Sequence, residues 1–107
     1  MPTIPLELLR QAAAQGRVHW HHHALRRLLE RGISLGEVVD AITNGEPIET
    51  YPDDRPYPSC LFLRLGATPL HVVASIDPVE HICHVITAYY PNITHFGPDM
   101  RTRRQKQ

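Results

Sequence analysis

The sequence predicts an α+β fold in which N-terminal helices pack on an antiparallel sheet of about four strands. Apolar residues recur at helical spacing as far as residue 44, and beyond Gly45 they form short runs rich in β-branched residues. The loops between these runs are short, which is typical of an antiparallel meander. Because 107 residues suffice for one modest core, we expect a single domain over residues 1–107.

Two helices are expected before residue 32. The first covers residues 5–15 and lies in an N-terminal addition, residues 1–18; Gly16 suits its C-terminal end. Residues 17–20 fit either a short strand or an extended lead-in. The second helix runs from about residue 21 to 31 and ends at Gly32.

A third helix is expected over residues 35–44. Ser34 precedes Glu37 by three residues, which is the spacing of a capping box, and Gly45 ends the pattern. These signals are local, so they explain this segment without any function.

The second half of the chain reads as strands joined by turns. We expect strands at residues 48–51, 59–65, 70–76 and 81–90, with a proline-rich loop at 52–58. Cys60 and Cys83 fall inside two of these strands. They fit buried, reduced packing residues, with a cross-strand disulfide as the alternative. Residues 19–90 then form the core of the domain and residues 91–107 a basic tail.

Composition and charge exclude some protein classes. The formal net charge is zero with histidine neutral, which argues against a broadly basic nucleic-acid coat but not against a small basic site. No apolar run approaches the ~20 residues of a membrane span, and no signal-peptide pattern begins the chain. We therefore expect a cytoplasmic protein with no membrane partner.

One line of polar residues on the second helix suggests chemistry. His23, Arg27 and Arg31 are spaced i, i+4 and i+8, so they share one face. A solvated helix face is one interpretation. The other is a histidine that exchanges a proton beside guanidinium groups that hold a phosphate.

Two histidine-rich motifs invite a metal interpretation, which we do not adopt. His19 is followed by His21, His22 and His23, but adjacent residues on a helix point about 100° apart and cannot face one ion. On the last strand, His81 and Cys83 share a face while His84 takes the other, so few ligands converge there. We expect no metal and no cofactor.

A set of motifs resembles a known family. They are His23-Ala-x-x-Arg27-x-x-x-Arg31-Gly-Ile-Ser34, Asn44-Gly45-Glu46, Ile48-Glu49-x-Tyr51, Tyr57-Pro58-Ser59-Cys60-Leu61, Pro69-Leu70-His71-Val72-Val73 and Ile86-Thr87-x-Tyr89-x-Pro91. Together they resemble the bacterial domain-of-unknown-function family 4258 over roughly residues 19–104. Members of that family resemble the RelE/ParE superfamily of toxins, including the BrnT and MqsR types.

The resemblance implies a RelE-like fold, with N-terminal helices packed on a curved antiparallel sheet. It also implies the toxin component of a type II toxin–antitoxin system, acting as a metal-independent endoribonuclease on messenger RNA, including ribosome-bound messenger RNA. The implied protein partner is an antitoxin with a zinc finger and a helix-turn-helix.

Under this hypothesis, His23 and His71 transfer protons and the Tyr89 hydroxyl positions or protonates the substrate. Arg27 and Arg31 hold the scissile phosphate. The tail residues Arg101, Arg103 and Arg104 contact backbone phosphates, which would make the affinity salt-dependent.

Two other functions compete with the endoribonuclease. The first is a non-catalytic binding module that pairs with the zinc-finger and helix-turn-helix partner. The second takes residues 21–31 and 35–44 as a DNA-binding helix-turn-helix. This second alternative is weakened because the recognition helix would carry Glu37 and Asp40 and no Lys or Arg.

Overall fold

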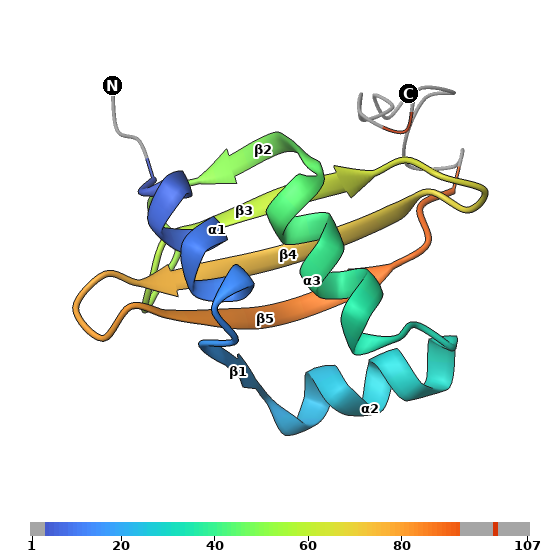
Figure 1. Ribbon diagram of the computed structural model, residues 1–107, viewed down its shortest axis with the longest axis horizontal. Helices are drawn as coiled ribbons and strands as arrows, with labels where there is room; N and C mark the ends of the chain where they lie inside the picture. The colour runs from blue at the N-terminus through green and yellow to red at the C-terminus, as the bar shows by residue number, and fades with distance from the viewer. Residues whose placement is uncertain (1–3, 93–99, 101–107) are drawn as a thin grey trace.

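The computed structural model describes residues 4–92 and residue 100, and in this part of the chain it has three helices and one five-stranded sheet (Figure 1). The elements in chain order are α1 (Leu6–Ala14), β1 (Val18–Trp20), α2 (His22–Arg31), α3 (Leu35–Asn44), β2 (Glu46–Tyr51), β3 (Ser59–Arg64), β4 (Leu70–Asp77) and β5 (Ile82–Tyr89). The strand order is β1-β5-β4-β3-β2. The predicted α+β class and all three predicted helices are confirmed.

The expected sheet of about four antiparallel strands needs a correction, since the sheet has five strands and is mixed. Strands β2 to β5 form the expected antiparallel meander, but β1 pairs in parallel with β5. The register places Val18 opposite Cys83 and His19 opposite His84. Three residues are too few for a clear periodic signal, and their partner strand lies more than sixty residues further along the chain.

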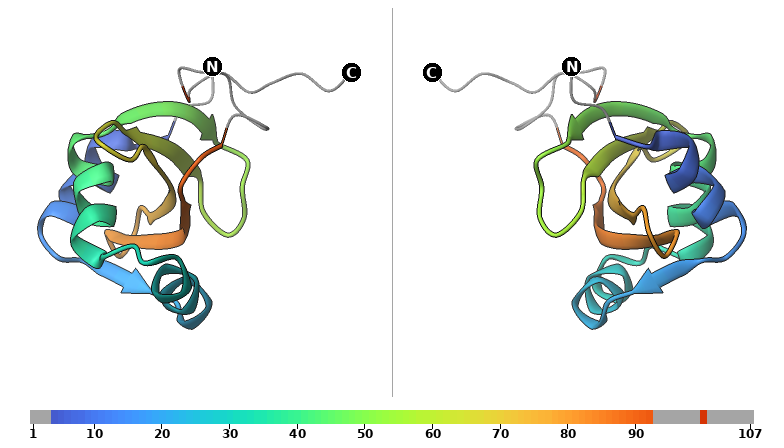
Figure 2. Two further views of the ribbon diagram at one scale, coloured as in Figure 1. Left: turned by 90° about the vertical axis from the view of Figure 1, so that its right-hand side faces the viewer. Right: turned by 90° about the vertical axis from the view of Figure 1, so that its left-hand side faces the viewer.

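Helices α1 and α3 cover one face of the sheet, and α2 lies along the edge near β5 (Figures 1 and 2). Because side chains alternate along a strand, every second residue of β3 and β4 enters the core beneath these helices. Strand β5 does the same with Cys83, Val85 and Ala88, with one extra residue before Ala88 at the register shift. The largest core side chains are Leu9, Leu28, Val38, Ile42, Phe62, Leu70, Val72, Ile76 and Val85.

The other face of the sheet is the one that α1 and α3 leave uncovered. The residues between the core positions point there: His71, Ser75 and Asp77 from β4, and His84 from β5. In Figure 2 the loop between β2 and β3 lies on this side, away from α1 and α3. We call this surface the open face.

The ends of α2 and α3 form as the sequence predicts. Gly32 has a left-handed φ of 67°, which ends α2. At the start of α3, the Glu37 amide donates to Ser34 Oγ at 3.1 Å, and the Ser34 amide donates to Glu37 Oε2 at 2.8 Å. The predicted capping box is therefore confirmed.

A contact from α1 stabilises the C-terminal end of α3. Arg10 on α1 donates to the carbonyl oxygens of Thr43 at 2.8 Å and Gly45 at 2.9 Å, where carbonyls would otherwise have no partner within the helix. A Cβ atom on Gly45 would lie 2.2 Å from the carbonyl oxygen of Ala41. Only glycine therefore fits the passage from α3 into β2.

Among the described residues, no helix combines the length and the apolar character that a membrane span requires.

Candidate functional site

His71 and Tyr89, predicted as site residues, lie opposite each other in the β4–β5 register. His71 Nε2 is 2.7 Å from the carbonyl oxygen of Met100 and Nδ1 is 3.4 Å from the Tyr89 hydroxyl. A carbonyl only accepts, so Nε2 carries the proton and Nδ1 accepts from Tyr89. His71 is fully buried, with 0% of its surface exposed. The pair therefore orders the end of the sheet, with His71 closed off from solvent and Tyr89 half-buried.

The three residues predicted to share one face of α2, His23, Arg27 and Arg31, lie in three different environments. Arg31 donates to the carbonyl oxygen of Ala88 at 2.7 Å, tying the end of α2 to β5. Arg27 makes an exposed ion pair with Glu30 at 3.5 Å. His23 is exposed on the first turn, about 12 Å along the helix from Arg31.

Arg31 is thus the member of the line that reaches the strand carrying Tyr89. His23 does not reach Tyr89 in the same way, because two helical turns separate it from Arg31. Arg101, Arg103 and Arg104 lie outside the described residues.

A histidine cluster that the sequence prediction missed lies on the open face. His21 Nε2 and His84 Nδ1 are 3.0 Å apart, within hydrogen-bond distance. The His19 ring centroid is 4.2 Å from that of His21 and 5.4 Å from that of His84. The Tyr57 ring stacks on His84 at 5.3 Å with an interplanar angle of 18°.

The backbone explains why these three imidazoles meet. His19 is in β1, and His21 follows as the N-cap of α2 with extended backbone angles, so both side chains lie on the same side. The parallel pairing of β1 with β5 then sets His19 directly opposite His84.

A cavity of about 290 Å³ opens beside the cluster, and we call it the histidine cavity. Its lining residues are His21, Asp54, Arg55, Pro56, Tyr57, Ser75, His84 and Ile86. They come from the start of α2, the loop before β3, and strands β4 and β5, so residues far apart in sequence build one site. The cavity has the size of a small aromatic ligand and offers ring, imidazole and guanidinium groups.

The surroundings of His84 favour its neutral form. Burial lowers the pKa of its imidazole, and the positive charges that His21 and His19 can carry lower it further, while Asp77 opposes them. Asp77 keeps its own charge, because the backbone amides of Glu80 and Val79 donate to it and lower the pKa of its carboxyl.

Tyr57 links Asp77 to the cluster. Its hydroxyl donates to the Asp77 carboxylate, and this bond is the first cause of the raised pKa of the Tyr57 phenol, with burial the second. The phenol therefore keeps its proton at neutral pH, and its ring is held flat against His84.

The metal and disulfide interpretations find no positive support. Within residues 4–92 and 100, no group of three or more His, Cys, Asp or Glu side chains is arranged to hold a metal ion. Cys60 and Cys83 are free thiols on the core side of the sheet, and burial raises the pKa of each to about 12. Both therefore act as packing residues, as predicted.

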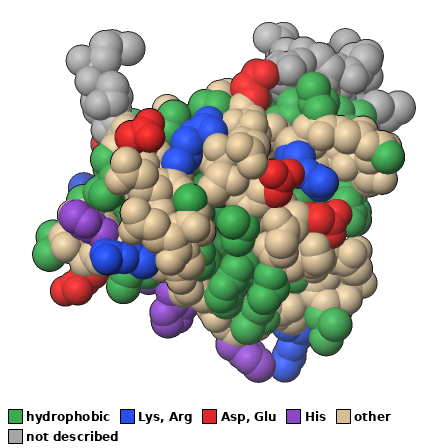
Figure 3. Space-filling model, viewed as in Figure 1, with side chains coloured by type: hydrophobic (Ala, Val, Ile, Leu, Met, Phe, Trp, Pro, Cys, Tyr) green, Lys and Arg blue, Asp and Glu red, His purple; other side chains and the backbone are tan. Residues whose placement is uncertain are grey.

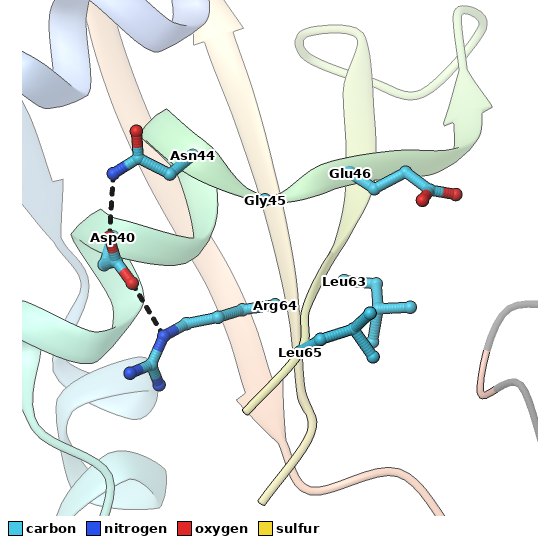
Figure 4. Close-up of a pocket in the computed structure, with 7 residues that line it drawn as sticks. All are labelled: Asp40, Asn44, Gly45, Glu46, Leu63, Arg64 and Leu65. Atoms are coloured by element: carbon cyan, nitrogen blue, oxygen red, sulfur yellow. Dashed lines mark hydrogen bonds and ion pairs between the residues drawn. The ribbon is translucent and has the colours of Figure 1, made fainter. Parts of the chain in front are cut away.

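A second hollow, of about 320 Å³, lies where α3 meets β2 and β3 (Figure 4). The one Lys or Arg side chain in its lining is Arg64, whose Nε donates to Asp40 Oδ2 at 2.7 Å, with Glu37 3.7 Å from the same guanidinium. Asn44 also donates to Asp40. Because carboxylates already balance the arginine, this hollow does not present the positive charge that an anion needs.

Comparison with known proteins adds one match. A family model described as "Domain of unknown function (DUF4258)" matches residues 20–90, a range that contains α2, α3 and β2 to β5. His21, Tyr57 and His84 all lie inside the matched range, whereas α1 lies outside it. No curated protein and no solved structure matches the chain.

Proposed function

We propose that this chain, which belongs to the family of domains of unknown function DUF4258, is an endoribonuclease that uses the His21–His84 pair for proton transfer. The observation that carries the proposal is the contact of two imidazoles at 3.0 Å beside a cavity that an aromatic ring helps to line. The substrate would be messenger RNA, and the reaction would need no metal because the two imidazoles supply both proton transfers.

A hydrogen bond between two neutral imidazoles leaves one ring nitrogen available on each. The ring that donates the shared proton keeps a lone pair, and the ring that accepts it keeps an N–H. The His21–His84 pair therefore offers a base at one end and an acid at the other, whichever tautomer it holds. The lowered pKa of His84 favours the neutral form of that imidazole.

Cleavage of RNA uses this arrangement in one step. The base takes the proton from the ribose O2′, the O2′–P bond forms and the P–O5′ bond breaks, and the leaving O5′ takes a proton from the acid. The shared proton moves from one imidazole to the other during the step, and exchange with water resets the pair. The products are a 2′,3′-cyclic phosphate and a 5′-hydroxyl.

The residues first predicted for catalysis take supporting roles in this proposal. Buried His71 and its partner Tyr89 order β4 and β5, and Arg31 ties α2 to β5, so together they fix the strand that carries His84. His23 and Arg27 remain exposed on α2.

The wider biological assignment is part of the same proposal. We take the protein to be the toxin of a type II toxin–antitoxin system with a RelE-like fold, bound and neutralised by a protein that has a zinc finger and a helix-turn-helix. The support is the motif resemblance, together with an antiparallel meander whose helices cover one face. Growth arrest on expression, relieved by co-expression of the partner, would test this assignment.

The enzymatic proposal is tested with purified protein and a fluorescent RNA in EDTA, with and without translating ribosomes. We expect His21→Gln and His84→Asn each to lower the cleavage rate by about a hundredfold or more. End-group analysis should find the cyclic phosphate, and an all-deoxy strand should remain intact because it lacks the attacking hydroxyl.

The control is His22→Gln, which removes an exposed neighbouring histidine whose contacts are with Arg26 and His23 on the same helix. This variant should cleave RNA at the normal rate. If both His21→Gln and His84→Asn retain full activity, or if the wild-type protein cleaves nothing under either condition, the proposal is wrong.

Exposed leucines favour a second candidate, the non-catalytic protein-binding module. Leu29 is 84% exposed, Leu35 44% and Leu25 38%, on α2 and at the start of α3. Figure 3 shows hydrophobic side chains gathered in the lower part of the view, where α3 and α2 lie. If binding is the whole function, Leu29→Glu should abolish complex formation with the zinc-finger partner, and the protein expressed alone should not arrest growth.

A further inference from the structure

A further hollow lies next to the histidine cavity. Its volume is about 300 Å³ and its lining residues are Gly16, Arg17, Val18, His19 and Ile82. These residues come from the turn after α1, from β1, and from the first position of β5. We call it the β1 hollow.

Shared elements connect the two hollows. His19 lines the β1 hollow and His21 lines the histidine cavity, and their ring centroids are 4.2 Å apart. On β5, Ile82 and His84 are two residues apart, so both point to the open face. The hollows are therefore neighbours along the β1–β5 edge, with the histidine cluster between them.

The β1 hollow carries positive charge on an exposed side chain whose backbone is held in place. Arg17 is the Lys or Arg residue among its lining residues, and none of these is acidic. The Arg17 amide donates to the Ala12 carbonyl at 2.8 Å, and its own carbonyl accepts from the Cys83 amide at 2.9 Å. Its backbone is thus held from both sides, unlike the carboxylate-paired Arg64 in the hollow of Figure 4.

The histidine cavity offers a different surface. Pro56, Tyr57 and Ile86 give it a largely apolar lining, and a volume of about 290 Å³ accommodates a flat heteroaromatic ring. Nucleobases stack on aromatic side chains in proteins that bind single strands, with little dependence on which base is present. A base and a phosphate thus have separate places on either side of the histidine cluster.

We infer that single-stranded RNA binds across both hollows, with a base against Tyr57 in the histidine cavity and an adjacent phosphate held by Arg17 in the β1 hollow. The inference rests on the proposed function and extends it by naming the strand's path and its phosphate-binding residue. The linkage between that base and that phosphate then passes the histidine cluster, where the His21–His84 pair carries out the proton transfers.

Binding is measured apart from cleavage with a labelled 2′-O-methyl RNA hexamer, which cannot form the attacking alkoxide. Fluorescence anisotropy gives the Kd at several salt concentrations. Arg17→Gln should weaken binding about tenfold and reduce the slope of log Kd against log salt by about 0.7, because one phosphate contact is lost. Tyr57→Leu should weaken binding about tenfold with no change in that slope.

The matched control is Arg26→Gln, which removes the same charge from an exposed position on α2. It should leave both the affinity and the slope unchanged. Wild-type binding that Arg17→Gln does not alter would overturn the inference while leaving the catalytic proposal standing. Arg17-dependent binding without any cleavage of ordinary RNA would support the strand path and reject the endoribonuclease. A wild-type protein that does not bind the hexamer would overturn the inference.

Discussion

Replacement of Arg31 by methionine tests whether this arginine holds the fold or a substrate. Methionine keeps the aliphatic stem and removes the guanidinium, which donates to the Ala88 carbonyl oxygen at 2.7 Å. A hydrogen bond from a charged donor contributes about 1.5–3 kcal/mol, and because Arg31 is exposed we expect its bond to contribute about 1.5 kcal/mol. For a domain of this size, that corresponds to a loss of about 6–12 °C in Tm.

The matched variant is Arg27→Met on the same helix. Its ion pair with Glu30 is 3.5 Å long, with side chains 62% and 54% exposed, so its loss should cost only about 0.3–0.5 kcal/mol. Thermal unfolding followed by circular dichroism at constant pH and salt compares the two proteins. Equal Tm values would refute the structural role of Arg31. Loss of RNA affinity at unchanged stability would restore the phosphate-binding role expected from the sequence.

Three further predictions concern stability. Gly45→Ala should cost about 3 kcal/mol or more in a urea titration, because the new Cβ would lie 2.2 Å and 2.8 Å from two backbone oxygens. Gly66→Ala should cost far less, because apart from its chain neighbours no residue lies within 4 Å of the added Cβ. Ser34→Ala should lose about 1 kcal/mol by removing the acceptor of the Glu37 amide, and Ser34→Thr should recover part of it; an unchanged urea midpoint in Ser34→Ala would contradict the capping role. The pKa of His84 is lower in the folded state than in the unfolded state. The contribution of His84 to stability is therefore present above its unfolded-state pKa and is lost as the pH falls through its folded-state pKa. The Tm should therefore fall more steeply in the wild type than in His84→Asn between about pH 7.5 and about pH 5, and parallel curves would show that His84 is not responsible.

Much of the helical half could be predicted because its signals are local. Ser34 and Glu37 are three residues apart and form their capping box within one turn, and Gly32 ends α2 through its own backbone angles. The antiparallel pairing of β4 with β5 also follows from two consecutive strands joined by a short turn, whereas the register shift between Val73 and Ala74 is what sets His71 opposite Tyr89. Such features need no knowledge of distant contacts.

The histidine cluster could not be predicted in this way because it depends on a parallel pairing between distant segments. One signal was nevertheless present in the sequence. If the residues around position 21 are taken as helix, the side chains of His21, His22 and His23 point in different directions. If residues 18–21 are taken as extended, the side chains of His19 and His21 lie on the same side of the backbone, as observed. What the sequence does not contain is the position of His84, which only the register of β1 against β5 supplies.

The family match divides the proposed activity between two parts of the chain. His21 and His84 lie within residues 20–90, whereas Arg17 and His19 lie before that range. If both proposals hold, proton transfer belongs to the part that matches the family, and part of the RNA affinity comes from the segment before it. Truncation cannot separate the two, because α1 supplies Leu9 to the core and Arg10 to the end of α3. Point variants at Arg17 and His84 can, since the first should change the affinity for RNA and the second the rate of cleavage.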